Sequence, residues 1–359
     1  MASFAYYRLP HEKTYTLMTQ STGQPEVFGS LESLNGQNGF VIAPFAVSDD
    51  CPVILIHPDK IEHRPVCEVV ADGHRHDVSM AVTSDRDIYM DDFAGCHAML
   101  MSGEYRKIVL ARSADIRTDI AIGAEELFMR ACLAYPRMFV VLVHTPQSGT
   151  WLAATPEILL EGNAGRWKTV ALAGTMSLED GQLGFDSPAS PHSEGTAPDI
   201  LWSTKNIKEQ RYVATYIADN LKSLAYDITE EGPKTVRAGN LVHLRSDFTF
   251  SLNEEGKVGD VLTALHPTPA VCGLPKDATW RHIVEQEHTE RKYYSGFMGP
   301  LNHDNETHLY VSLRCMRQMD DHTFRLYAGG GLLRDSDAGQ EWLETEAKMK
   351  TMKRLFHFE

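Results

Sequence analysis

The amino-acid sequence predicts an α+β fold made of antiparallel sheet with helices around it. Short apolar runs bounded by turn residues indicate strands, and several neighbouring runs are close enough to form hairpins. Helical patterns lie among these strands in mixed order, which is typical of α+β proteins. No short-period repeat and no linker between autonomous domains is visible, so we expect one domain over residues 1–359.

The composition narrows the class of protein. With 43% hydrophobic and 23% charged residues, the chain has globular proportions. The net charge of −15 argues against nucleic-acid and membrane partners, so an anionic substrate would need local cations. No apolar run reaches transmembrane length, and the first residues lack a secretory signal. Six scattered cysteines without a CxxC pair indicate neither zinc nor disulfides, and we expect a cytoplasmic protein.

In the first half of the chain, turn residues mark where the expected helices and strands end. Residues 1–85 carry no pattern that indicates chemistry, and we expect them to complete a sheet. Gly103 ends an apolar-periodic helix, and a PQSG turn joins two later strands into a hairpin. The expected elements are strands at 39–47 and 52–58, a helix at 88–102, a strand at 104–112, a helix at 124–135, and strands at 138–145, 150–162 and 168–176.

The second half opens with a polar loop at 177–199, whose length and Gly, Pro and Ser content indicate a mobile excursion. The longest helix follows, and Glu209 is offset from its apolar stripe so that it could face a cleft. The turn HPTPAVCG at 266–273 could form a pocket wall or a plain loop. The expected elements are a helix at 205–226, a strand at 240–252, two helices within 261–286, and a hairpin of 308–316 and 322–330 to which the segment 294–301 leads.

The stretch 326–348 concentrates charge after three glycines. The glycines at 329–331 indicate a turn whose backbone can approach a ligand. In the helix that follows, Glu341, Glu344 and Lys348 share one face, as a site for a divalent cation and an anion would require. The alternative is an ordinary solvated pair between Glu344 and Lys348.

Three further charges stand in apolar surroundings. Lys107 lies in an apolar strand, where burial would lower its pKa and make it a usable base; the alternative is an edge-strand lysine. Glu157 precedes three aliphatic residues, which would raise its pKa and suit a general acid; a solvent-facing strand end is equally consistent. Arg314 is a strand arginine able to hold a carboxylate through two hydrogen bonds.

These segments together resemble the chorismate-utilising enzymes, a family that includes isochorismate, salicylate, anthranilate and aminodeoxychorismate synthases. The resemblance covers residue 90 to the C-terminus, whereas the first 85 residues are similar only loosely. The matching blocks are YRKIVLAR, TPEILL, LAGT, STKNIKEQ, LVHL, HPTPAVCG, EHTERKYYSGFMG, VSLRC, YAGGGLL and EWLETEAK.

The resemblance implies one α+β domain with two related halves, an active site in the cleft between them, chorismate as substrate and Mg²⁺ as cofactor. Lys107 matches the lysine that activates water, and Glu157 matches the acid that protonates the departing hydroxyl. Metal ligands are implied at Glu209, Glu344 and Glu341, and substrate contacts at Gly174, Thr175, His243, Tyr294, Arg314, Gly329, Gly330, Gly331 and Lys348. The family also implies a free-standing monomer or weak dimer without a glutamine amidotransferase subunit.

Lysine at 107 discriminates within the family, because amine-transferring members typically carry glutamine there. It favours isochorismate synthase or salicylate synthase, and HPTPAVCG resembles the former. The sequence departs from the family pattern at two positions of the block STKNIKEQ, which contains Glu209. Asn206 replaces an acid there, and Gln210 replaces a histidine. These departures leave open a catalytically impaired relative that only binds a chorismate-like ligand or a partner protein.

Overall fold

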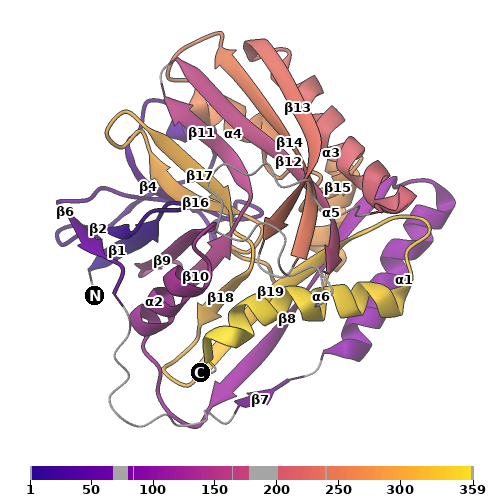
Figure 1. Cartoon of the computed structure of the whole chain (residues 1–359), viewed down its shortest axis with the longest axis horizontal. Coiled ribbons are helices and arrows are strands. Elements are labelled where there is room, and N and C mark those ends of the chain that lie inside the picture. The colour runs from indigo at the N-terminus through magenta and orange to yellow at the C-terminus, as the bar shows by residue number, and fades with distance from the viewer. Residues whose placement is uncertain are drawn as a thin grey trace.

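Two antiparallel sheets form the body of the protein, with helices packed around them (Figure 1). The computed structural model describes residues 2–67, 80–83, 85–163, 165–177, 201–238 and 241–356. The predicted α+β class is confirmed, whereas residues 178–199 of the predicted polar loop lie outside the described part. None of the described helices is both long enough and apolar enough to cross a membrane.

The first sheet has ten strands in the described residues, ordered β15-β8-β19-β18-β10-β9-β1-β2-β6, with β7 paired to β8. These strands are β1 (Ser3–Arg8), β2 (Thr14–Gln20), β6 (Lys60–Pro65), β7 (Met80–Val82), β8 (Lys107–Thr118), β9 (Phe139–Thr145), β10 (Gly149–Thr155), β15 (Gly273–Leu274), β18 (Cys315–Gln318) and β19 (Thr323–Leu332). One face of this sheet packs against α2 (Ala124–Ala134) and α6 (Ala338–Lys353). Near β8, α1 (Arg86–Ser102) and α5 (Lys276–Gln286) share a smaller apolar cluster.

The second sheet has nine strands in the same described ranges, ordered β13-β14-β12-β11-β17-β16-β4-β5-β3. They are β3 (Glu26–Phe28), β4 (Gly39–Ala43), β5 (Val53–Ile56), β11 (Ile158–Asn163), β12 (Arg166–Ser177), β13 (Ala225–Ala238), β14 (Leu241–Leu252), β16 (Phe297–Leu301) and β17 (Thr307–Val311). Helices α3 (Thr204–Leu221) and α4 (Val258–Leu265) pack on it. Short 3₁₀ helices lie at Glu32–Leu34 and Arg354–Phe356.

The inner faces of the two sheets meet in a shared aromatic and aliphatic core. Phe139 of the first sheet stacks on Tyr310 of the second, with ring centroids 4.4 Å apart. Burying such a side chain contributes roughly 1.5–3 kcal/mol, so this layer stabilises the pairing of the sheets. Strands from the first 85 residues form one edge of each sheet, as the sequence predicted. The expected single domain stays a prediction.

Two predicted strands are each divided between the sheets. The segment 150–162 is β10 followed by β11, broken at Pro156, which has no N–H to continue a ladder. The segment 308–316 is β17 followed by β18, with the break at Arg314. The predicted helix 205–226 ends at Leu221, because the chain turns there into β13, a strand missed in the sequence. The glycines at 329–331 belong to β19 and form no turn.

Candidate functional site

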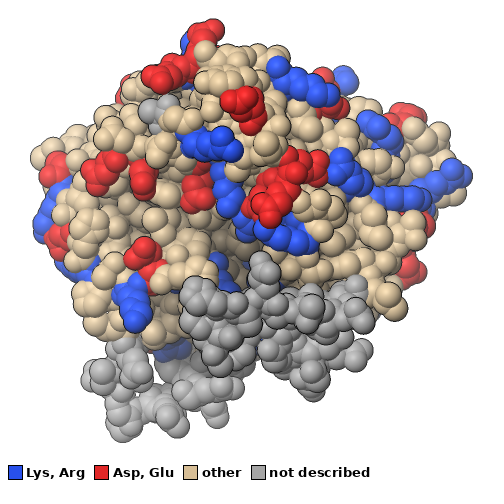
Figure 2. All heavy atoms as spheres, turned by 45° about the horizontal axis from the view of Figure 1, so that its top comes forward, with Lys and Arg blue, Asp and Glu red and all other residues tan. Residues whose placement is uncertain are grey.

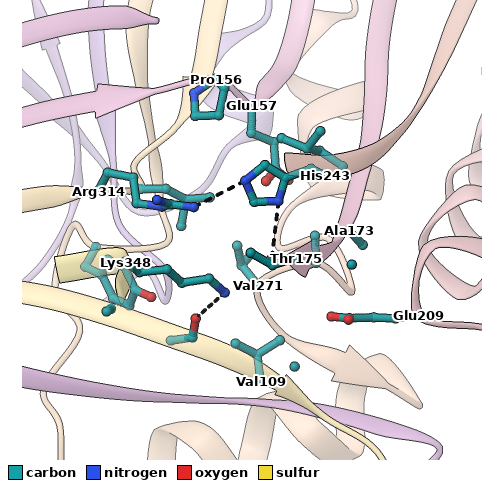
Figure 3. A pocket seen from close by; sticks show the side chains of 18 residues that line it. Val109, Pro156, Glu157, Ala173, Thr175, Glu209, His243, Val271, Arg314 and Lys348 are labelled. Atoms are coloured by element: carbon teal, nitrogen blue, oxygen red, sulfur yellow. Dashed lines mark hydrogen bonds between the residues drawn. The ribbon is translucent and has the colours of Figure 1, made fainter. Parts of the chain in front are cut away.

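A pocket lies between the two sheets, with walls from β8, β19, β12 and β14 and with one residue each from α3 and α6 (Figure 3). Many of the residues predicted from the sequence line it. These are Glu157, Gly174, Thr175, Glu209, His243, Tyr294, Arg314, Gly329, Gly331 and Lys348. The turn 266–273 supplies Ala270 and Val271, so the prediction of a pocket wall there is confirmed. Lys107, Gly330, Glu341 and Glu344 lie outside this lining.

Arg314 and His243 form a polar chain across one side of the pocket (Figure 3). Burial, together with the charges of Arg314 and Lys348, lowers the pKa of His243 well below its usual range, so the imidazole is neutral. Nη2 of Arg314 donates to Nε2 of His243 over 3.3 Å. The imidazole proton therefore resides on Nδ1, which donates to Oγ1 of Thr175 over 3.2 Å.

Arg314 is held in an unusual backbone conformation. It lies in the connection between β17 and β18 with φ of +46°, a left-handed value that costs a non-glycine residue roughly 1–3 kcal/mol. Burial lowers the pKa of its guanidinium to about 10, so the group stays charged at neutral pH. The prediction of an arginine inside a strand was therefore wrong in its local structure, although the side chain does reach the pocket.

Glu157 is one of two acids that line the pocket, and only 3% of the residue is exposed. Burial raises the pKa of its carboxyl to about 8, although the charges of Lys107, Lys348 and Arg314 oppose that shift. Its place directly after Pro156, where the chain passes from one sheet to the other, aims it at the space between the sheets. The raised pKa predicted from the sequence agrees with this burial, and the carboxyl is largely protonated at neutral pH.

Lys107 is the first residue of β8 rather than a mid-strand residue, and it is completely buried. Its Nζ lies 3.0 Å from Oε1 of Glu209 on α3 and has no well-oriented hydrogen-bond acceptor within the described chain. Burial disfavours the charged form of Glu209, yet Lys107 and Lys348 lower the pKa of this carboxyl overall. The edge-strand alternative for Lys107 is therefore excluded by its burial.

The glycines of β19 allow carboxylates to approach the strand from both sides. A Cβ on Gly330 would lie 3.2 Å from Oε2 of Glu341 and 3.7 Å from Oε1 of Glu344. A Cβ on Gly331 would lie 2.1 Å from Oε1 of Glu209. The predicted anion-binding turn was wrong, because these residues pair with β8; their lack of side chains makes room for acids instead.

Each candidate metal ligand has a lysine partner. Lys107 pairs with Glu209, and Lys348 lies 2.7 Å from Oε1 of Glu344 and donates to the carbonyl of Gly329 over 2.9 Å. The third pair was missed in the sequence: Lys205, on the first turn of α3, binds Oε1 of Glu341. Its spacing of four residues from Glu209 on one helix face was the available signal.

The start of α3 is held close to β12. The hydroxyl of Ser203 accepts from the backbone N–H of Asn206, which caps the helix. Gly174 has φ of +76° at a bulge in β12, and a Cβ there would lie 3.1 Å from Cβ of Asn206. Only glycine fits this approach. Gln210 lies deeper in the helix and donates to Oγ of Ser246 over 2.8 Å.

The fit of a divalent cation can be judged from the carboxylates. The described residues contain no group of three His, Cys, Asp or Glu side chains close enough to hold a metal. Glu341 and Glu344 nevertheless flank Gly330 together, and Oε2 of Glu341 is buried without a hydrogen-bond partner in the described part of the chain. Mg²⁺ is bound by hard oxygen ligands and commonly uses only one or two carboxylates, so these residues fit it.

Charged side chains of both signs are mixed over the face shown in Figure 2. No extended single-sign patch appears among the described residues of that face.

The pocket lining combines a buried arginine and a partly buried lysine with one protonated acid, a set of charges that suits a small anionic molecule. The model of the chorismate binding enzyme family matches residues 61–357 of the chain. This match covers most of the sequence, so the protein belongs to the chorismate binding enzyme family.

Particular relatives are similar over large parts of the chain. The isochorismate synthase EntC of Escherichia coli (strain K12) is 28% identical over 260 residues, which span 72% of this chain but only 64% of that protein. The structure of MenF, the menaquinone-specific isochorismate synthase from Escherichia coli, has a TM-score of 0.79 at 21% identity, over 99% of this chain and 88% of that one.

Anthranilate synthase component I from Streptococcus pneumoniae has a TM-score of 0.68 at 14% identity, over 98% of this chain and 90% of that one. At identities this low, both structural likenesses establish the fold alone. Because the fold extends to an enzyme named for a different product, the reaction has to be argued from the site.

Proposed function

We propose that the protein is an isochorismate synthase that converts chorismate to isochorismate. The observation that carries this proposal is a pair of buried groups: Glu157 lines the pocket, and Lys107 contacts the pocket-lining Glu209. Lys107 can take a proton from water and Glu157 can give one. The name of the similar protein EntC, an isochorismate synthase, also supports it. Family members that use ammonia typically have glutamine at the position of Lys107.

In the proposed reaction, Lys107 takes a proton from water as the water oxygen bonds to C2 of the ring. Glu157 gives its proton to the C4 hydroxyl, which leaves as water, so one water enters and one leaves. Arg314 and Tyr294 hold the enolpyruvyl carboxylate, while Lys348 and the backbone of Gly174 and Thr175 contact the ring carboxylate, with His243 near the ring.

We propose Mg²⁺ as the cofactor, held by Glu209, Glu344 and Glu341. When bound, the cation would neutralise and orient the ring carboxylate. The three carboxylates already lie beside the glycines of β19, and each has a lysine partner.

The test is to incubate the purified protein with chorismate and Mg²⁺ and to separate the products by chromatography. Isochorismate alone is the expected product. Equal amounts of salicylate and pyruvate would instead identify a salicylate synthase. Mg²⁺-dependent chorismate binding without any product would identify the impaired relative that the changes at 206 and 210 raise.

A further inference from the structure

The short connection between β19 and α6 contains a buried serine, Ser336, that has no role in the reaction above. The backbone N–H of Leu333 donates to its hydroxyl oxygen over 3.0 Å. The backbone N–H of Ser336 in turn donates to the carbonyl of Leu333 over 3.0 Å, so both the backbone and the side chain of the serine are held in place. A serine hydroxyl that accepts one hydrogen bond still has its proton to donate. The group that takes this hydrogen bond is a carboxylate of α6.

The hydroxyl of Ser336 donates to Oε1 of Glu341 over 2.7 Å. Lys205 on α3 binds the same oxygen, so two donors from separate segments hold one side of this carboxylate. Hydrogen bonds to an ionised carboxylate are stronger than those between neutral groups. The side chain of Glu341 is only 3% exposed, so water has little access to compete for these bonds. The carboxylate is therefore held in one orientation.

The second oxygen of Glu341 is left for another ligand. Oε2 is buried and has no hydrogen-bond partner among the described residues. It lies against Gly330, where an added Cβ would be 3.2 Å from this oxygen and 3.7 Å from Oε1 of Glu344. A buried acceptor without a partner is costly, so its presence here points to a ligand that satisfies it. The two bonds at Oε1 thus leave Oε2 beside Gly330, close to the second carboxylate.

We propose that Ser336 is a positioning residue for Glu341: its hydroxyl, together with Lys205, fixes Oε1 so that Oε2 is presented to a divalent cation. The proposal rests on the Mg²⁺ site proposed above. Groups that orient metal ligands in this way typically contribute about 10–100-fold to metal affinity. Mg²⁺ demands near-ideal octahedral geometry, whereas Ca²⁺ accepts flexible arrangements of oxygen ligands. A carboxylate fixed from behind should therefore matter more for Mg²⁺ than for Ca²⁺.

The experiment compares Ser336→Ala with the wild-type full chain. Replacing the serine leaves the charge of the site unchanged, whereas loss of Lys205 would also remove a positive charge that repels the cation. Calorimetry without chorismate measures the Kd for Mg²⁺ and the Kd for Ca²⁺ in separate titrations. We expect the Kd for Mg²⁺ to rise about 10-fold. The Kd for Ca²⁺ should rise less than about threefold, because Ca²⁺ tolerates a carboxylate that is free to turn.

The matched control is Asp337→Ala, at the neighbouring residue. The side chain of Asp337 caps α6 by accepting from the backbone N–H of Gln340 over 3.0 Å, and it is exposed, so its charge is screened. Its removal loosens the same end of the helix without removing a bond to the Glu341 carboxylate. Both variants should lower the melting temperature measured without metal, but only Ser336→Ala should lose Mg²⁺ affinity. If Asp337→Ala loses Mg²⁺ affinity to the same extent, Ser336 is merely structural and the proposal is overturned.

Two further outcomes would reject the role of Ser336. One is an unchanged Kd for Mg²⁺ in Ser336→Ala, and the other is an equal loss of affinity for Mg²⁺ and Ca²⁺. In both cases the proposed reaction stands if the wild type makes isochorismate. A wild-type protein that binds no Mg²⁺ would overturn both this proposal and the metal site. Selectively weaker Mg²⁺ binding in a protein that makes no isochorismate would support the role of Ser336 and reject only the reaction.

Discussion

Nζ of Lys107 lies 3.0 Å from Oε1 of Glu209, which pairs the residue predicted to activate water with a residue predicted to bind the metal. One comes from β8 and the other from α3, so the contact crosses from the first sheet to the helix packed on the second. It depends on a glycine, because a Cβ on Gly331 would lie 2.1 Å from Oε1 of Glu209 and 2.9 Å from Cε of Lys107.

Replacement of Gly331 by alanine should therefore disable the site. The added methyl cannot be accommodated without moving Lys107 or Glu209, and such overpacking costs about 1–3 kcal/mol. We expect turnover to fall at least ~100-fold, since small misplacements of reacting groups have effects of that size.

Gly95→Ala is the control variant, because nothing lies within 4 Å of the position that its new Cβ would take. An alanine inside α1 should stabilise the protein by ~0.5–1 kcal/mol and leave turnover normal. Normal activity in Gly331→Ala would show that the Lys107–Glu209 contact is dispensable.

Removal of either proton-transfer group should lower turnover far more than substrate affinity. We expect Lys107→Ala and Glu157→Gln each to reduce kcat by about 10²–10⁴-fold with a small change in KM, because their contributions arise in the transition state. Steady-state kinetics with chorismate at saturating Mg²⁺ measures both constants. If either variant keeps nearly full kcat, the role assigned to that residue is wrong.

The pH dependence should report the ionisation of Glu157. Its pKa is raised from 4.5 to about 8, so the protonated form needed for proton donation is lost as the pH rises through about 8. The reaction rate should therefore fall as the pH rises above about 8. The residual rate of Glu157→Gln should not show this fall, because glutamine does not ionise.

The same shift affects stability in a defined direction. The folded protein holds this proton more tightly than the unfolded chain, so the contribution to stability is fully present below pH ~4.5 and is lost as the pH rises to about 8. Chemical denaturation across this range should show wild type losing stability relative to Glu157→Gln. A parallel pH profile for the two proteins would contradict the raised pKa.

The sequence predicted the residues of the site better than their local structure. The apolar surroundings of Glu157 are contiguous in the chain, so its raised pKa could be read from its neighbours. The division of 150–162 and 308–316 between two sheets could not be predicted from the sequence. A strand that passes from one sheet to another has the same periodicity as one that stays in a single sheet. Arg314, with its left-handed backbone, lies in the connection where the second of these segments passes from one sheet to the other.

The glycines at 329–331 and Lys205 also owe their structural roles to distant residues, which local sequence patterns do not show. A run of three glycines is a local turn signal, and only pairing with β8 converts it into a strand. The spacing of Lys205 and Glu209 could have placed both side chains on one helix face, but Glu341, the partner of Lys205, is 136 positions away and no local pattern identifies it. The missed strand β13 is rich in charged residues and Gly-Pro, and its strand character comes from pairing with β14.

Restoring the acid that the family has at position 206 should strengthen metal binding. Asn206 lies in the first turn of α3, one turn before Glu209, where a carboxylate would also be favoured by the helix dipole. We expect Asn206→Asp to lower the Kd for Mg²⁺ several-fold in calorimetry. Gln210→His tests the other departure and should leave the Kd unchanged, because that side chain contacts Ser246. Equal affinities for wild type and Asn206→Asp would exclude position 206 from the metal site.

The pocket wall should depend on a buried ion pair, Glu287 with Arg291. The guanidinium is bidentate to the carboxylate, with both contacts at 2.6 Å, and it also donates to the carbonyls of Val271 and Val109 over 2.8 Å. It therefore joins the turn 266–273 to β8, and both carbonyls belong to pocket-lining residues. Arg291→Met leaves Glu287 buried without its partner, which typically costs about 3–5 kcal/mol.

Chemical denaturation gives this free energy of unfolding directly, and a partly exposed pair supplies the comparison. Arg211 lies 2.7 Å from Glu230 with its side chain 48% exposed, so Arg211→Met should cost less than about 1 kcal/mol. Arg291→Lys keeps the charge but cannot reach both backbone carbonyls and the carboxylate together. It should fold with reduced stability and a higher KM for chorismate, because the wall at Val271 is no longer tied to the strand that begins at Lys107. An unchanged KM in a folded Arg291→Lys protein would show that the pair supports the fold without shaping the pocket.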